Sequence, residues 1–179
     1  MALSLRPFEM SDLNDFSDLH SDPHVMHDLG GPISRADAEE KLHKYIAAHS
    51  AKGYGRMAVF EGGDFAGYVG VQHLPDPAHP LGPHDEIGWR IARPFWGQGI
   101  ATRAATLCLE DVFSRAGLPH ILSYTARDNT RSQAVMARLG LTRIPSLDFD
   151  EPYPPIGTWH GLVWRMTAKD RAQRAGGIE

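Results

Sequence analysis

The sequence of 179 residues lacks the features of several familiar protein classes. Cys108 is the only cysteine, which excludes an intrachain disulfide and a zinc site built on thiolates. No uninterrupted apolar run approaches the length of a membrane span, and the first residues lack the cationic and apolar pattern of a signal peptide. We therefore expect a cytoplasmic protein that does not act on membranes.

A strong excess of charge of one sign is also missing. The chain carries 18 basic and 22 acidic residues, a net charge of −4, which argues against a nucleic-acid binder. Hydrophobic residues make up 42% of the chain, enough for a packed core. The length suits one domain, which we place at residues 1–168, and the polar residues 169–179 predict a frayed C-terminal tail.

What is present is an irregular alternation of strand and helix patterns. Helices are expected at residues 11–19, 35–52, 100–116 and 130–139. Strands are expected at residues 3–8, 56–61, 65–74, 84–92, 120–126, 141–149 and 162–167. This order predicts an α+β (mixed α/β) domain with a central mixed sheet of about seven strands and flanking helices.

The segment 86–102 carries the most chemical information. It combines a predicted strand, a turn with Gly97 and Gly99, and a predicted helix. Glycines allow backbone N–H groups to face a ligand, and the first turn of a helix adds unpaired N–H groups and a positive dipole end. Together they suit a phosphate or pyrophosphate. Taken alone, the tripeptide 97–99 is better explained as a tight strand-to-helix turn.

The wider context favours the phosphate interpretation. Residues Pro94-Phe95-Trp96-Gly97-Gln98-Gly99-Ile100-Ala101-Thr102 resemble the coenzyme A pyrophosphate loop of the GNAT acyltransferase superfamily, whose pattern is Gln/Arg-x-x-Gly-x-Gly/Ala. Trp96 stands at the Gln/Arg position, as is usual in the RimJ/RimL-like branch, whereas Arg103 departs from the glutamate often found there. Asn129-Thr130-Arg131-Ser132, followed by Leu139-Gly140-Leu141, resembles the Asn-x-x-Ser helix of the same family.

The resemblance implies a sheet that is splayed between its fourth and fifth strands and binds acetyl-CoA there. It implies an N-acetyltransferase that passes the acetyl group directly to an amine, on a small molecule or a protein N-terminus, in a ternary complex without a metal. The residues that it implies for coenzyme binding lie on the fourth strand, the phosphate loop and the helix after the fifth strand. They are Ile91, Ala92, Arg93, Trp96, Gly97, Gln98, Gly99, Ile100, Ala101, Thr102, Asn129 and Ser132.

Two residues are candidates for catalysis. Glu86, on the fourth strand, is the candidate base, and the alternative is a glutamate paired with a nearby arginine or histidine. A regular strand points Glu86 and Ile91 to opposite faces, unless the bulge of the family's fourth strand is present. Ser132 is the candidate acid, because Met136 stands where many family members carry a tyrosine. A backbone N–H near Ile91 is the expected oxyanion donor.

Several alternatives stay open. The chain is also interpretable as a non-catalytic acyl-CoA-binding sensor or regulatory module, or as an enzyme with another donor such as succinyl-CoA. Apolar residues in the last strands are compatible with a homodimer, and Asp148, Asp150 and Glu151 are candidates for an acidic acceptor cleft.

Two other features have ordinary explanations. The spacing of His20, His24 and His27, interrupted by Pro23, argues against a metal site. Cys108 lies between leucines on a helical pattern, which favours a core thiol over a nucleophile.

Overall fold

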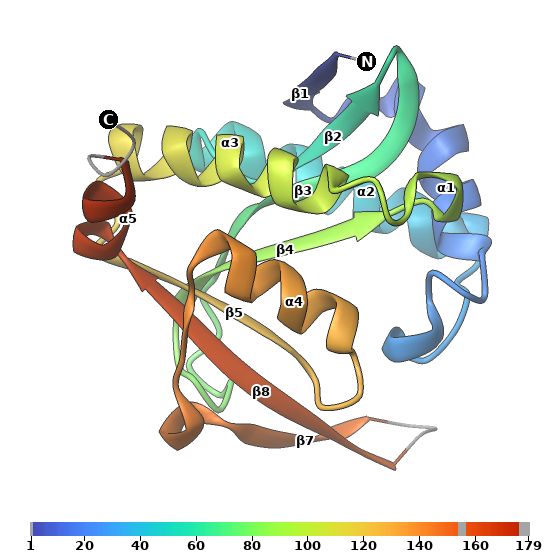
Figure 1. Ribbon diagram of the computed structural model, residues 1–179. Coiled ribbons are helices and arrows are strands. Elements are labelled where there is room, and N and C mark those ends of the chain that lie inside the picture. The colour runs from blue at the N-terminus through green and yellow to red at the C-terminus, as the bar shows by residue number, and fades with distance from the viewer. Residues whose placement is uncertain (1, 154–156, 176–179) are drawn as a thin grey trace.

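The computed structural model describes residues 2–153 and 157–175, which form one mixed sheet with helices on both faces (Figure 1). The strands follow the order β1-β2-β3-β4-β5-β8-β6, and β7 pairs with β8 beside this path. Among the strand pairs of the described residues, only β4 with β5 is parallel. The strands are β1 (Leu3–Pro7), β2 (Arg56–Glu61), β3 (Asp64–Leu74), β4 (His84–Ile91), β5 (His120–Ala126), β6 (Thr142–Arg143), β7 (Phe149–Tyr153) and β8 (Gly157–Thr167).

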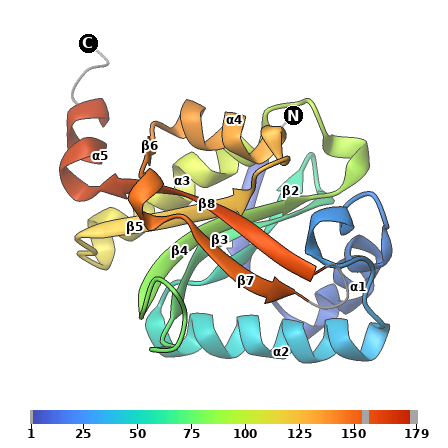
Figure 2. The same ribbon diagram turned by 90° about the horizontal axis from the view of Figure 1, so that it is seen from below.

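The long helices cover the two faces of the sheet in pairs. Figure 2 shows α2 on one side of the sheet together with α1, and α3 and α4 on the other. Their bounds are α1 (Leu13–Ser21), α2 (Arg35–Lys52), α3 (Ile100–Arg115), α4 (Thr130–Leu139) and α5 (Ala168–Ala175). Short 3-10 turns are η1 (Met10–Asp12), η2 (His27–Leu29), η3 (Arg93–Phe95) and η4 (Pro145–Leu147).

Each face of the sheet has its own hydrophobic core because side chains alternate along the strands. On β4, Ile87 and Ile91 pack with buried residues of α3 such as Leu109. The opposite face packs Tyr68 of β3 against Phe16 of α1 and residues of α2. Residues on β4 therefore reach one layer or the other according to whether their number is odd or even.

Local signals explain where the helices begin and end. The Ser34 hydroxyl accepts a hydrogen bond from the Asp37 N–H at 3.1 Å and caps α2, and Gly53 ends that helix in the left-handed conformation. Asn129 caps α4 in the same manner, and Gly140 ends it. These boundaries agree with the sequence prediction.

The C-terminal part differs from the prediction in two places. The expected strand over 141–149 is wrong, because Pro145 opens η4 and divides the segment into β6 and β7. In the segment expected to be a frayed tail, the structure has a helix, α5, over Ala168–Ala175, and the domain bounds stay a prediction. Thr167 caps this helix, because its hydroxyl accepts a hydrogen bond from the Asp170 N–H at 3.1 Å, and Arg171 donates to Glu110 of α3. Residues 176–179 lie outside the described part.

Candidate functional site

The fourth and fifth strands touch at one point and then separate. Their register contains a single pair, Glu86 with Leu122. Next to it, the Ser123 hydroxyl donates to the carbonyl of Ile87 at 2.8 Å. Towards their C-terminal ends the two strands diverge, as the sequence resemblance implied.

Backbone groups of β4 face this gap. The N–H of Ala92 donates to the carbonyl of Ala66 at 2.8 Å, so the even-numbered residues of β4 bond to β3. The backbone groups of Trp89 and Ile91 consequently point toward β5. One of them is already used, since the Trp96 indole N–H donates to the carbonyl of Ile91 at 2.7 Å.

The loop after β4 leads directly into the start of α3. Gly97 and Gly99 have φ values of +76° and +71°, which non-glycine residues rarely adopt. Gly99 is the N-cap of α3, with no side-chain capping bond and no acidic residue in the first turn. A Cβ built on either glycine meets nothing within 4 Å, so the space in front of the helix is open. This helix end can therefore receive an anion.

Helix α4 forms the opposite wall. The Asn129 Oδ1 accepts from the N–H of Ser132 at 3.0 Å, which caps the helix. The Asn129 Nδ2 donates to Asp28, 101 positions away in the sequence. Met136 is fully buried one turn after Ser132.

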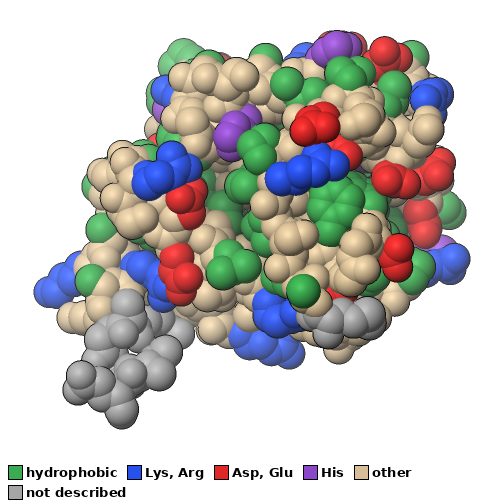
Figure 3. All heavy atoms as spheres, turned by 90° about the horizontal axis from the view of Figure 1, so that it is seen from above, with side chains coloured by type: hydrophobic (Ala, Val, Ile, Leu, Met, Phe, Trp, Pro, Cys, Tyr) green, Lys and Arg blue, Asp and Glu red, His purple; other side chains and the backbone are tan. Residues whose placement is uncertain are grey.

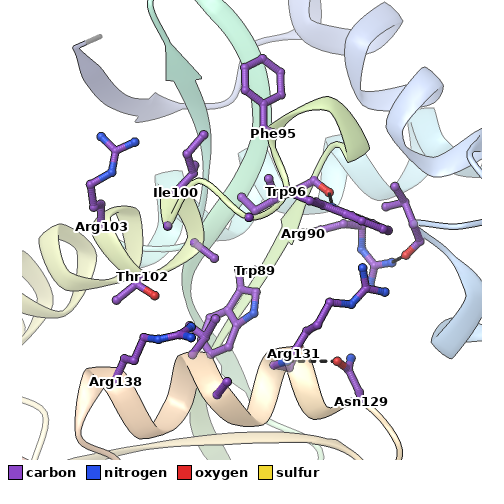
Figure 4. A pocket seen from close by; sticks show the side chains of 18 of the residues that line it. Trp89, Arg90, Phe95, Trp96, Ile100, Thr102, Arg103, Asn129, Arg131 and Arg138 are labelled. Carbon is purple, nitrogen blue, oxygen red and sulfur yellow. Dashed lines mark hydrogen bonds between the residues drawn. The ribbon is translucent and has the colours of Figure 1, made fainter.

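These elements enclose one cavity of about 630 Å³ (Figure 4). Thr102, Arg103 and Arg138 lie at one end of it, and Arg90, Arg131 and Asn129 at the other. The lining residues are His24, Val25, Asp28, Trp89, Arg90, Ile91, Phe95, Trp96, Gly97, Gly99, Ile100, Ala101, Thr102, Arg103, Asn129, Arg131, Ser132, Ala134, Val135 and Arg138.

The cavity is cationic. Among its described lining residues, four are arginines and one, Asp28, is acidic. The guanidinium of Arg131 lies 4.0 Å from the centre of the Trp96 ring, a cation–π contact between the loop and α4. On the face shown in Figure 3, by contrast, basic and acidic side chains are interspersed. The arginines of the cavity are therefore a local feature.

Most of the residues expected to bind coenzyme line this cavity. Ala92, Arg93 and Gln98 are not among them. The N–H of Ala92 donates to the carbonyl of Ala66 on β3. The Arg93 Nε lies 3.6 Å from the Asp22 Oδ2. The Gln98 side-chain amide donates to the carbonyl of Pro94 at 3.0 Å. Their predicted roles stay predictions.

Sequence reasoning missed several lining residues. Trp89 was detectable, because it alternates with Ile91 along the strand. Arg131, Val135 and Arg138 were also detectable, because their spacing puts them on one face of α4. His24 and Asp28 carried no such signal, since the loop after α1 has no periodic pattern.

Glu86 lies outside the cavity lining. Its carboxylate is buried and forms an ion pair with Arg56, whose guanidinium also donates to the carbonyl of Gly70. A Cβ on Gly88 would lie 2.8 Å from Glu86 Oε1, so glycine leaves room for the pair. This contact matches the structural alternative that the sequence left open, and the role of Glu86 as a base stays a prediction.

The expected bulge does not occur in the pairing of β4 with β3. The register runs without a shift from His84 to Ile91, and the irregularity lies instead between Val59 and Phe60, in the pairing of β2 with β3. Glu86 and Ile91 therefore point to opposite faces, as in a regular strand.

Glu86 and Arg56 belong to a buried polar group on the α1/α2 face. Arg90 donates to the Tyr68 hydroxyl at 3.0 Å. Burial alone would raise the pKa of Tyr68, but the nearby cations Arg90, Lys41 and Arg56 lower it to about 8. The pKa of Lys41 is itself lowered, first by burial and then by Arg90 and Arg56.

The other singled-out residues have structural surroundings. His20 is fully buried, and burial lowers its pKa to about 4. Burial raises the pKa of the Cys108 thiol to about 11, as expected for a core residue. In the described part of the chain no group of three metal-ligating side chains comes together. No helix of that part is both long and apolar enough to cross a bilayer.

The acidic residues near the last strands are already engaged. The Asp148 carboxylate forms an ion pair with the Arg143 guanidinium. The Asp150 Oδ1 lies 2.6 Å from the His160 Nδ1. Glu151 lies 3.7 Å from His79. Trp159 packs against Phe149. None of these residues lines the cavity.

Comparisons with known proteins agree with this architecture. The profile of the family described as "Acetyltransferase (GNAT) domain" matches residues 2–142. The chain is 31% identical over 152 residues to the FsC-acetyl coenzyme A-N(2)-transacetylase of Aspergillus fumigatus, covering 81% of this chain and 64% of that relative. It thus spans somewhat less than two thirds of the relative's length.

Solved structures share the fold. An acetyltransferase of the GNAT family from Bacillus anthracis superposes with a TM-score of 0.78 at 22% identity, covering 94% of this chain and 96% of that one. RimL, a ribosomal alpha-N-protein acetyltransferase in complex with coenzyme A, gives 0.75 at 18% identity, covering 95% and 96%. With its profile match, its splayed sheet and its open helix end, the chain belongs to the GNAT acetyltransferase family, in its RimJ/RimL-type branch.

Proposed function

We propose that the chain is an N-acetyltransferase that transfers an acetyl group from acetyl-CoA directly to an amine. The observation that carries this proposal is the cavity, in which the uncapped start of α3, four arginines and the open edge of β4 meet. A volume of about 630 Å³ lies within the range of cofactor sites. Arginines suit a ligand that carries phosphate charges, although Arg103 also pairs with Glu61 at 3.0 Å and Arg90 donates to Tyr68.

The residues present fit coenzyme A. The N–H groups at the start of α3, with Gly97 and Gly99, would hold the pyrophosphate. Arg103 and Arg138 lie at the same end of the cavity (Figure 4). Arg103 is paired with Glu61 at 3.0 Å, so Arg138 would supply most of the positive charge for the remaining phosphate. The backbone groups of Trp89 and Ile91 would pair with the pantetheine arm. When bound, the coenzyme supplies an acetyl group held as a thioester.

The chain's own groups then serve the transfer. The N–H groups of Trp89 and Ile91 face the gap, and either would stabilise negative charge on an acyl oxygen held there. Ser132 lines the cavity and has a hydroxyl that can donate a proton. Met136 is buried and has no proton to give. Glu86 would have to accept the proton from the amine while its Oε2 is paired with Arg56.

Turnover in the presence of amines tests the proposal. Release of free thiol from acetyl-CoA is measured with spermidine, an aminoglycoside and peptides with free N-termini, and coenzyme binding is measured on the same sample. Release that depends on one class of amine supports the enzyme and identifies its acceptor. Absence of coenzyme binding would contradict the proposal.

Two observations favour a second function. The proposed base is tied in an ion pair, and the usual position of the acid is a methionine. A non-catalytic acyl-CoA sensor or regulatory module would bind coenzyme without amine-dependent release. An acyl donor longer than acetyl, a homodimer and a cytoplasmic location stay predictions.

A further inference from the structure

The layer of the sheet that faces α1 and α2 holds an excess of positive charge. Burial alone would raise the pKa of the Tyr68 hydroxyl, but three cations of this layer lower it to about 8. They are Arg90 of β4, Lys41 of α2 and Arg56 of β2. Two carboxylates oppose these cations, because Glu86 pairs with Arg56 and Asp28 interacts electrostatically with Arg90. The third cation, Lys41, has no such partner among the described residues.

Lys41 is half-buried, and its ammonium forms no hydrogen bond or ion pair with any residue that the structure describes. Its Nζ lies 6.0 Å from the centre of the Tyr45 ring. Burial lowers the pKa of Lys41, Tyr68 acts in the opposite sense, and Arg90 and Arg56 lower it further. The Nζ is not a buried atom, so solvent reaches it. An anion beside this ammonium would relieve the repulsion between the cations.

Arg90 carries the positive charge of this layer to the cavity, which it lines. Its Nε donates to the Tyr68 hydroxyl at 3.0 Å, and its Nη1 contacts the carbonyl of Val25 and the sulfur of Met26, both at 3.0 Å. These contacts fix the side chain. The Nη2 has no hydrogen-bond partner in the described part of the chain and is not a buried atom. Because a guanidinium carries N–H donors on all three nitrogens, those of Nη2 are available to a ligand.

The phosphates of the coenzyme do not account for this end of the cavity. Thr102 at the start of α3 and Arg138 lie at the end opposite to Arg90 (Figure 4). Arg90 points toward the layer of α1 and α2, whereas α3 and α4 lie on the other face of the sheet (Figure 2). An anion on Arg90 therefore belongs to a second ligand, and in the proposed reaction that ligand is the acceptor.

We propose that Arg90 and Lys41 bind a carboxylate of the acceptor, and that the acceptor is consequently an amine that also carries a carboxylate, on an amino acid or a peptide. This inference rests on the proposed acetyltransferase function. Arg90 binds the carboxylate directly, and Lys41 attracts it by charge. The same positive potential favours the neutral form of the amine, which is the form that attacks a thioester, and it disfavours polyamines.

Acceptors that differ only in the carboxylate test this inference. Each of the common amino acids, and a set of dipeptides, is compared with its own C-terminal amide. The two sets distinguish a free amino acid from a peptide terminus as the source of the carboxylate. Release of thiol from acetyl-CoA gives kcat and KM for each compound. For the best acceptor, we expect kcat/KM to be at least tenfold higher than for its amide.

Substitutions of Lys41 separate its charge from its packing. Lys41→Met removes the charge and keeps an unbranched side chain. We expect it to raise KM for the best carboxylated acceptor at least fivefold and KM for the corresponding amide less than twofold. Lys41→Arg restores the charge and should bring KM back to within twofold of the wild type. The dissociation constant of coenzyme A, measured by calorimetry, should change less than twofold in both variants.

Lys44→Met is the matched control. Lys44 lies exposed on the same helix and pairs with Glu40, so its substitution removes the same charge away from the cavity. We expect its KM for the carboxylated acceptor to equal that of the wild type within twofold. Calorimetry of the acceptors with the coenzyme-loaded protein reads acceptor affinity without turnover in every variant.

The outcomes distinguish the inference from the proposed function. Equal rises of KM for the acid and its amide in Lys41→Met overturn the inference, because Lys41 would then only support packing. A polyamine or an amide that is a better acceptor than every carboxylated amine also overturns it. Both results leave the acetyltransferase function standing. Coenzyme binding without acetylation of any amine contradicts the proposed function instead. Carboxylate binding that Lys41→Met weakens would still support the site of Arg90 and Lys41, and its absence would overturn that site as well.

Discussion

At the scale of single residues, burial determines what the charged side chains can do. Glu86 is buried and Arg56 nearly so, and each is the other's partner, so neither is readily available to solvent. Asp28 is only half buried, accepts a hydrogen bond from the Asn129 amide and interacts electrostatically with Arg90. Two carboxylates near one strand thus have different roles because of their neighbours. Burial likewise determines whether a histidine can take up a proton.

His20 makes the stability of the protein depend on pH. Its ring is fully buried against Phe16 and Tyr68, and burial holds its pKa at about 4, below the ordinary value of 6.5. Since the unfolded chain takes up this proton first, the stabilisation is complete above about pH 6.5 and is lost as the pH falls toward 4. We expect a loss of up to about 3 kcal/mol in the free energy of unfolding from this residue.

Urea unfolding at pH 7 and pH 5 measures this effect. His20→Phe keeps an aromatic ring in the core and should reduce the dependence on pH. The control is His27→Gln, at an exposed position, which should show the pH dependence of the wild type. An equally steep dependence in His20→Phe would contradict the assignment to His20.

Glu86→Gln tests whether the buried pair is structural. The substitution leaves the Arg56 guanidinium without its carboxylate in a buried place, and we expect the free energy of unfolding to fall by about 3 kcal/mol. Glu40→Gln removes an exposed partner of Lys44, and the expected change is below about 0.5 kcal/mol. Denaturant titration measures both variants.

A Glu86→Gln variant that keeps its stability but loses activity would instead support Glu86 as the catalytic base. That role predicts little change in stability, a fall in kcat and loss of the acidic limb of the pH–rate profile. The measured profile therefore decides between the two interpretations of this residue.

At the scale of elements, the helix ends differ in a way that reflects their use. The start of α2 is satisfied by Ser34 and Asp37, and that of α4 by Asn129. The start of α3 has a glycine cap, no capping bond and open space in front of it. A helix end without a capping partner is less stable than a capped one, unless a ligand supplies the missing hydrogen bonds.

Gly99→Ala is predicted to weaken coenzyme binding more than folding. The left-handed conformation at φ +71° costs an alanine about 1 kcal/mol, and its methyl group would occupy the space where an anion lies. We expect the dissociation constant of coenzyme A to rise at least tenfold in isothermal titration.

The control shares the backbone strain but lies at the other end of α3. Gly117 has φ +61°, and a Cβ there also meets nothing within 4 Å. Gly117→Ala should lose a similar free energy of unfolding and bind coenzyme like the wild type. Equal affinities in the two variants would contradict the assignment of the anion site to Gly99.

At the scale of the whole molecule, the sheet consists of two parts that meet at one pair of residues. Strands β1 to β4 form one part and β5 to β8 the other, joined in the sheet at Glu86 and Leu122. The Asp28–Asn129 and Trp96–Arg131 contacts span the gap where the strands have separated. A ligand in the cavity adds contacts to both parts.

Coenzyme A is therefore expected to stabilise the whole fold. At a concentration of 100 times its dissociation constant, a ligand that binds only the native state adds about 2.7 kcal/mol. For a chain of this length, the melting temperature should rise by roughly 5–10 °C. Calorimetric melting with coenzyme A, and with adenosine 3′,5′-diphosphate as the analogue without the pantetheine arm, measures the shift. No shift with saturating coenzyme A would contradict binding in the cavity.

Much of the fold was predictable because its signals are local. The bounds of β2, β5 and α4 agree with the sequence prediction, since alternation, caps and glycines act over a few residues. The last strands were predicted less well. Pro145 interrupts that region, and the pairing of β7 with β8 depends on residues far along the chain.

The sequence by itself determined the family and the glycine-bearing turn that leads into α3, because these depend on contiguous residues with distinctive chemistry. Only the tertiary structure decided that Glu86 pairs with Arg56, that four arginines from three elements share one cavity, and that Asp28 meets Asn129. These contacts join positions 30 to 101 residues apart. Such pairings arise from the packing of layers, and the spacing of residues along the chain does not encode them.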